Sequence, residues 1–228
     1  MKIPPCYIFN KKATLDFPGL QGFKLNDDFQ KFVLPATVEQ FYAVAAHLNP
    51  KKSLRHQPSN GKTHCDCLAS DFAAGFDCFL PGGVFWNDKY IEQKNKINSG
   101  YWFPVYGKTV HELSANDLYD WLNSPYAKMF GWEKANNVTE LQDIANQGYL
   151  CCISGKNNLP KGHGHISIVL PENKEKGMIA QRIEGKVFCP IICQAGSVCN
   201  NWTNKSSWFL SKQFKGTHGF YFNRGINE

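Results

Sequence analysis

Apolar residues recur at helical spacing through the first half of the chain. Thr37-Val-Glu-Gln40 predicts a capping box, so a helix should run from residue 38 to about residue 47 and end at Asn49-Pro50. A second, buried helix is predicted to begin at Cys65, because apolar residues then return every three or four positions: Cys65, Leu68, Ala69, Phe72, Ala73 and Phe76. Several prolines interrupt residues 1–35, which we expect to be irregular.

Aromatic side chains crowd residues 84–113, and their lack of periodicity predicts a long loop of the kind that often serves function. Ser114 then caps a predicted helix through Trp121, with Asp117 near its positive end. A second capping box, Thr139-Glu-Leu-Gln142, predicts a helix that stops at Gly148.

The second half of the chain reads mainly as strands. Residues 178–184 and 187–193 resemble a hairpin turning at Gly185-Lys186, with Pro190 at an edge or bulge. The other predicted elements are strands 149–154, 165–170 and 219–223 and a short helix at 207–214. Helices packed on an antiparallel sheet give an α+β fold, expected as one domain of residues 1–228, with an N-terminal extension and helix (1–60) and a catalytic core (61–200).

The composition is that of a globular chain, with 43% hydrophobic and 19% charged residues among 228. No apolar run approaches 18 residues, so we expect no membrane span. The basic residues are scattered and are not interleaved with aromatics, which argues against nucleic-acid binding. The positive net charge of +6 would favour approach to anionic polymers such as cell-wall material. The nine cysteines are expected to be mostly buried, reduced thiols.

Cys65 is the candidate nucleophile. A thiol attacks only as thiolate, and a helix N-terminus favours negative charge at the position that Cys65 should occupy. A cysteine at the start of a helix is more often structural than catalytic. A nearby general base is therefore needed to support a catalytic role for Cys65.

His165 and Gln194 are the candidate partners of Cys65. His165 follows Gly164 and opens a predicted strand, which would hold its ring rigidly at the sheet edge. Gln194 ends the strand expected beside it, where an amide oxygen can accept the imidazole N–H and fix the tautomer. The nearest other candidates for that orienting role are Asn200, Asn201 and Glu172.

The order of these segments resembles the NlpC/P60–CHAP branch of papain-like cysteine hydrolases, over about residues 60–200. Thr63-His64-Cys65-Asp66-Cys67-Leu68-Ala69-Ser70-Asp71-Phe72 is similar to the family's Cys-Asn-x-Phe-Val-x-Asp-Val helix start. Gly164-His165-Ile166-Ser167-Ile168-Val169 is similar to its Gly-His-Val-Gly-Ile-Val strand. Weaker similarities are Leu80-Pro81 with Trp86, the helix of residues 114–121, and Gln194-Ala195-Gly196.

The resemblance implies a papain-like fold and a hydrolase of peptide or amide bonds in peptidoglycan, with Cys65, His165 and Gln194 as catalytic residues. Substrate-binding residues would be His64, Trp86 and Gly164, and neither a metal nor another cofactor would be needed. The chain lacks a Sec signal, so it would be made in the cytoplasm, leave by another route as a type VI secretion effector, and act in the periplasm of a target cell. An immunity protein and a component of the secretion apparatus would then be further partners.

The chain also departs from this family. Asp66 stands where Asn is usual, Ser167 replaces a small Gly, and Gly148-Tyr149 replaces the usual Gly-Asp. A phage-type endolysin and a non-catalytic wall-binding module of the same shape remain open.

Two other chemistries are alternatives. A zinc site could draw on His64, Cys65, Cys67, His163, His165, Cys189 and Cys193, although the spacings do not match the usual knuckle. A serine hydrolase could use Ser70 or Asp71 with His64 or His165, although no Gly-x-Ser-x-Gly elbow is present.

Overall fold

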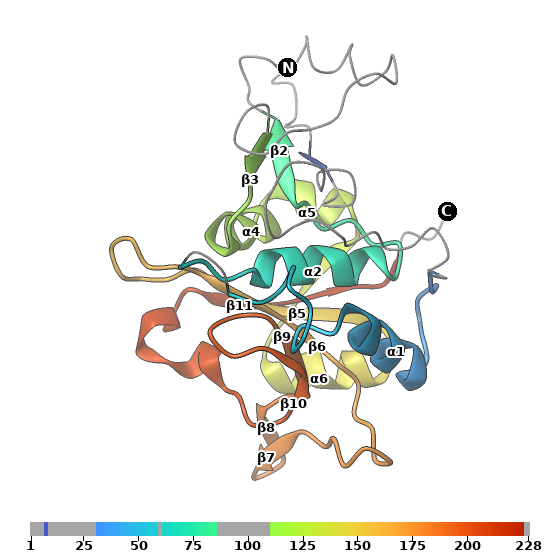
Figure 1. Cartoon of the computed structure of the whole chain (residues 1–228). Coiled ribbons are helices and arrows are strands. Elements are labelled where there is room, and N and C mark those ends of the chain that lie inside the picture. The colour runs from blue at the N-terminus through green and yellow to red at the C-terminus, as the bar shows by residue number, and fades with distance from the viewer. Residues whose placement is uncertain (1–6, 9–30, 59–60, 86–109, 226–228) are drawn as a thin grey trace.

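The fold is α+β and is centred on a six-stranded antiparallel sheet (Figure 1). The computed structural model describes residues 7–8, 31–58, 61–85 and 110–225. The strand order is β10-β9-β6-β5-β11-β4. These strands are β4 (Trp132–Ala135), β5 (Leu150–Gly155), β6 (His165–Val169), β9 (Ile192–Gln194), β10 (Asn200–Thr203) and β11 (His218–Asn223).

Helices cover both faces of this sheet (Figure 1). On one face lie α2 (Cys65–Ala74) and α4 (Ala115–Leu122), with α1 (Val38–Leu48) beside α2 and the short α5 (Pro125–Met129) after α4. On the other face lie α6 (Val138–Asn146) and two 3-10 turns, η3 (Trp208–Leu210) and η4 (Lys212–Phe214). The sheet is therefore the middle of three layers.

Alternation along the strands divides the apolar residues between the two faces, because successive strand side chains point in opposite directions. Ile166 and Ile168 of β6 lie in the core that contains α2 and α4. Val169 lies in the core that contains α6 and Phe209. Seven of the eight cysteines in the described part of the chain are buried, as expected for small apolar side chains: Cys65, Cys67, Cys78, Cys151, Cys152, Cys189 and Cys193.

The predicted starts of α1, α2 and α4 are confirmed, whereas the predicted N-cap of α6 is wrong. Thr37 and Gln40 form the predicted capping box of α1, and Ser114 with Asp117 forms one at α4. The helix from Cys65 is also present. The helix α6 begins two residues earlier than the Thr139 box implies, because Asn137 is its N-cap and accepts the amide of Glu140.

Strands β5, β6 and β11 match their predictions, but the predicted strand 187–193 is divided. Pro190 separates β8 (Lys186–Cys189), which pairs with β7 (Gln181–Ile183), from β9, which pairs with β6. The hairpin turns at Glu184 and Gly185, both at positive φ. Periodicity missed β4 and β10 and read η3 and η4 as one helix.

A three-stranded sheet was also not predicted. It consists of β1 (Tyr7–Ile8), β2 (Gly83–Phe85) and β3 (Val110–Glu112). These strands replace the ends of the predicted loop 84–113 and part of the irregular N-terminal segment. The remainder of that loop lies outside the described residues.

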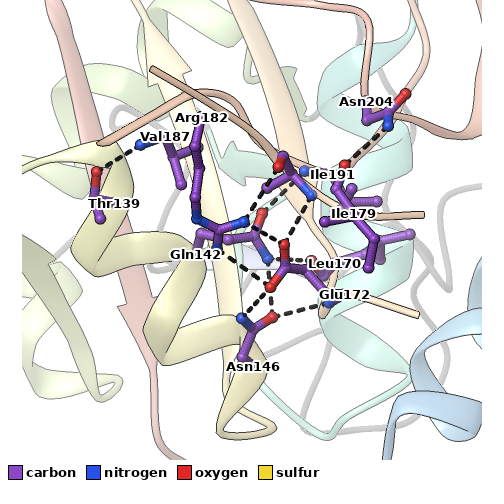
Figure 2. A network of polar contacts seen from close by, with 11 residues as sticks. Thr139, Gln142, Asn146, Leu170, Glu172, Ile179, Arg182, Val187, Ile191 and Asn204 are labelled. Carbon is purple, nitrogen blue, oxygen red and sulfur yellow. Dashed lines mark hydrogen bonds and ion pairs between the residues drawn. The ribbon is translucent and has the colours of Figure 1, made fainter. Parts of the chain in front are cut away.

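A buried glutamine bridges the backbone where Pro190 interrupts the strand (Figure 2). Leu170 donates its amide to Ile191 at 2.8 Å, but the reciprocal backbone bond is missing from that pair. The side chain of Gln142 takes its place. Its Oε1 accepts the Ile191 amide at 3.0 Å and its Nε2 donates to the Leu170 carbonyl at 2.9 Å. The amide of Gln142 therefore substitutes for one peptide group of the sheet and fastens α6 to it.

An ion pair next to this bridge fixes the chain after β6 (Figure 2). Arg182 donates both terminal nitrogens to the carboxylate of Glu172, which also accepts from Asn146 and from the Ala180 amide. Burial raises the pKa of Glu172, but Arg182 and these hydrogen bonds hold it below its ordinary value. Glu172 is thus committed to structure at the end of β6 remote from His165.

Replacing Gln142 with methionine should destabilise the fold by roughly 2–5 kcal/mol, because it leaves a buried N–H and a buried C=O without partners. Chemical denaturation measures this change. The matched control is Gln147→Met at the exposed end of the same helix, expected to change stability by less than about 0.5 kcal/mol. Equal stabilities for the two variants would contradict the bridging role.

Candidate active site

Cys65 opens α2 with its thiol buried, at 2% exposure. The residue before it, His64, is the N-cap and makes no side-chain cap bond. In α1, α4 and α6, by contrast, a Thr, Ser or Asn side chain accepts the first free amides. The start of α2 therefore leaves backbone N–H groups directed at the thiol, among them those of Cys65 and Asp66.

The thiol of Cys65 is nevertheless protonated at neutral pH. Burial raises its pKa to about 12, and the carboxylate of Asp66 adds to that rise. Hydrogen bonding from the backbone of Ile166, Asp66 and Cys65 itself acts in the opposite direction but does not prevail. The helix N-terminus, which the sequence suggested as an activating device, is thus outweighed by desolvation.

His165 is the first residue of β6, as predicted, and it contacts Gln194 at the end of β9. The Nε2 of His165 lies 3.4 Å from Oε1 of Gln194. The Nε2 of Gln194 donates in turn to the Val198 carbonyl at 3.4 Å, which sets the direction of the amide. An amide oxygen can only accept, so the hydrogen sits on Nε2 of the imidazole and Nδ1 keeps its lone pair.

The imidazole of His165 is neutral at physiological pH. Burial lowers its pKa to about 4, while the bond to Gln194 acts to raise it. The indole of Trp208 meets the ring edge-on, with centroids 4.6 Å apart and an interplanar angle of 82°. A Cβ at Gly196 would lie 3.1 Å from the ring carbon Cε1, so only glycine leaves the ring its present position.

Two neighbouring hollows contain these residues. The first hollow holds the thiol and is lined by Lys62, Thr63, His64, Cys65, Asp66, Ser114, Ala115, Asn116, His163 and Gly164. The second hollow holds the imidazole, and its lining includes His165, Gln194, Gly196, Val198, Trp208 and Gln213. Thr63, His163 and Gly164 belong to both hollows and form the strip that joins them.

The thiol and the imidazole approach this strip from opposite faces of the sheet. Cys65 shares the α2 core with Ile166, whereas His165 projects with Ser167 toward Trp208 on the α6 side. Within the described part of the chain, no hydrogen bond joins Cys65 to His165, although the predicted His165–Gln194 contact is present. The alternation of strand side chains explains the separation, because neighbours on a strand point apart.

Gly164 is required by a close backbone approach. A Cβ there would lie 2.5 Å from Oδ1 and 2.7 Å from the backbone nitrogen of Asn116, in the first turn of α4. Asn116 also donates to the Gly162 carbonyl and accepts the Asn157 amide. Asn116 therefore fixes the segment that leads into His165, a role that the sequence did not suggest.

His64, the predicted substrate-binding residue before Cys65, is among the residues that line the first hollow. The pKa of His64 is lowered mainly by burial, and the neighbouring His56, Arg55 and Lys62 lower it further. Trp86, the third residue predicted to contact substrate, lies outside the described residues. Trp208 was missed because its only sequence context is a short apolar segment with no chemical motif.

A buried ion pair connects Arg55, in the segment after α1, to Asp71 of α2. Arg55 donates through Nε and Nη2 to the carboxylate of Asp71, at 2.7 and 3.0 Å. His56 contacts the same carboxylate at 3.0 Å. Burial raises the pKa of Asp71, but Arg55 and His56 bring it below its ordinary value.

The residues of the alternative chemistries are used elsewhere. Ser70 donates to the Leu80 carbonyl and Asp71 is held in its ion pair, so neither faces the imidazole. Asn201 is bonded to Asn49 and to the Lys51 amide, away from His165. Among the described residues, no group of three or more His, Cys, Asp or Glu side chains is arranged to hold a metal ion.

Substituting Gln194 with Glu should raise the pKa of His165 from about 4 by roughly one to three pH units, because a carboxylate stabilises the imidazolium. A base must be neutral to accept a proton, so any activity that uses His165 should lose its acid limb at correspondingly higher pH. The measurement is an NMR titration of the ring.

Gln213→Glu is the matched control for this substitution. It adds the same charge to the second hollow from an exposed position and makes no hydrogen bond to the imidazole among the described residues. A His165 titration that moves equally in both variants, or in neither, would contradict a specific His165–Gln194 bond.

No helix in the described ranges is long and apolar enough to cross a membrane. No protein-family model matches the chain, and a search of the curated proteins finds no match either.

Proposed function

We propose that this chain is a cysteine-dependent hydrolase of amide bonds, built on a papain-like fold of the NlpC/P60–CHAP type. One observation carries the proposal. Cys65, at a helix N-terminus whose N-cap residue makes no side-chain cap bond, and His165, with a defined tautomer, line adjoining hollows that share the strip at Gly164. The α+β architecture and the sequence resemblance over about residues 60–200 are consistent with it.

In the proposed reaction, a substrate carbonyl lies over the strip formed by Thr63, His163 and Gly164. Nδ1 of His165 takes the thiol proton of Cys65 while sulfur bonds to the carbonyl carbon. Because both groups are neutral at rest, proton transfer accompanies attack instead of preceding it. Proton transfer requires the start of α2 and the start of β6 to bring the two groups closer than they lie here, where they approach the strip from opposite faces of the sheet.

The remaining steps regenerate the enzyme. Backbone N–H groups at the start of α2 would stabilise the oxyanion of the tetrahedral intermediate. His165 then gives its proton to the leaving amine as the carbon–nitrogen bond breaks. Water attacks the thioester, and the imidazole accepts one proton of this water before returning it to the thiolate of Cys65.

The proposed substrate is the stem peptide of peptidoglycan. The net charge of +6 favours approach to an anionic wall, and Lys62 lines the hollow that holds the thiol. We assign the chain to the antibacterial effectors of type VI secretion, which act in the periplasm of a target cell and are restrained by an immunity protein. A phage-type endolysin would use the same residues and is distinguished by its gene neighbours.

A non-catalytic wall-binding module is the second candidate. It is favoured by the protonated thiol and by the separation of Cys65 from His165. Such a module would retain the hollows and bind wall fragments without cutting them. Binding to purified sacculi together with intact muropeptides would identify this function.

Cys65→Ala should reduce cleavage of purified muropeptides by roughly four orders of magnitude or more, since no other group supplies the nucleophile. The products are identified and timed by mass spectrometry. Cys67→Ala, two residues along the same helix and equally buried, is the matched control and should retain activity. Turnover that survives in Cys65→Ala would refute the nucleophile.

His165→Ala should abolish cleavage as well, because it removes the base. His163→Ala and His64→Ala should have smaller effects, since these side chains line the hollows but make no hydrogen bond to Gln194 in the described structure. An inactive His163 or His64 variant beside an active His165 variant would transfer the role of base to that histidine.

A further inference from the structure

Trp208 is fixed against His165 by contacts on several sides. Its Nε1 donates to the hydroxyl of Ser167 at 3.1 Å, and its ring meets Phe214 edge-on with centroids 4.9 Å apart. Ser167 is buried and lies two residues after His165 on the same face of β6. The hydrogen bond therefore connects the indole to the strand that carries the imidazole.

Gly155 provides the space in which the indole sits. This residue faces His165 in the register of β5 and β6. A Cβ at position 155 would come within 3.0 Å of both Cζ3 of Trp208 and Cδ1 of Phe214. The absence of a side chain at Gly155 of β5 therefore leaves the space that lets the indole of Trp208 reach the imidazole.

The three groups around the imidazole restrict its motion from different directions. Gln194 holds Nε2, Gly196 approaches Cε1, and Trp208 closes a further side. Of these, Gln194 sets the tautomer but is a single bond at 3.4 Å, about which the ring could still turn. The remaining constraint must come from packing.

We propose that Trp208, anchored by Ser167, is a positioning residue that sets the orientation of the His165 ring. The inference rests on the proposed function in taking His165 as the base. It also gives a role to Ser167, whose hydroxyl accepts the hydrogen bond that holds the indole. The family that this sequence resembles has a glycine at that position.

Its first test is an NMR titration of the His165 ring nitrogens in Ser167→Ala, Trp208→Phe and the wild type. The wild-type ring should show the Nε2–H tautomer and remain neutral down to pH values near its pKa of about 4. Both variants should show mixed tautomers and a titration displaced toward the ordinary value, because the ring turns and water reaches it.

The matched control is Ser154→Ala. Ser154 is equally buried on β5, and its hydroxyl has no hydrogen-bond partner among the described residues. This variant should leave the His165 spectrum as in the wild type. Spectra of Ser167→Ala and Trp208→Phe that match Ser154→Ala would overturn the positioning role, whatever the activity of the protein.

The second test is kinetic, on the muropeptide cleaved by the wild type. Ser167→Ala and Trp208→Phe should each lower kcat roughly tenfold to a hundredfold, while KM changes less than about threefold. Adding Ser167→Ala to Trp208→Phe should cause no further loss, because the hydroxyl acts through the indole. Multiplying losses would overturn the linkage between the two.

The two tests separate the proposals. If the wild type cleaves no wall peptide, the proposed function fails and the NMR comparison still decides whether Trp208 orients the ring. If cleavage depends on Cys65 and His165 while the ring is unchanged in both variants, the function stands and the positioning role falls.

Discussion

The packing of α2 against β6 is the contact on which the candidate site depends. Ile166 and Ile168 bury one side of the strand against this helix, and that burial brings the first residue of the helix to the first residues of the strand. The same period-two alternation turns His165 to the other face, toward Trp208. The start of β6 thus lies between the two hollows, which share Gly164, and places Cys65 and His165 on opposite faces of the sheet.

Desolvation dominates the electrostatics of the site. Burial raises the pKa of Cys65 and lowers that of His165, and each shift favours the uncharged form. By contrast, Asp71 remains ionised in an equally buried position because Arg55 and His56 bond to it directly. Asp71, which has a structural role, is therefore charged, whereas Cys65 and His165, the proposed catalytic residues, are neutral. A bound substrate would have to supply part of the stabilisation that water supplies elsewhere.

Much of the secondary structure could be read from the sequence, because its signals are local. The caps at Thr37 and Ser114 and the alternation of β6 depend on residues within one element. The division of strand 187–193 depends on Gln142, some fifty positions away, which supplies the bond that lets the chain turn at Pro190. In the site, the bond that His165 donates to Gln194 was predictable from strand order. The roles of Trp208 and Asn116 were not, since each acts through a tertiary contact and belongs to no motif.

The two hollows are built from different stretches of the chain. Residues 62–66 and 114–116 surround the thiol, residues 194–214 supply most of the imidazole side, and only Thr63, His163 and Gly164 serve both. Each side can consequently accumulate changes with little disturbance of the other. Exchange of the C-terminal stretch by recombination would remodel the part of a ligand that is recognised beside His165 while the nucleophile and its helix stay intact. Such a division offers a simple route by which one scaffold could diversify its targets.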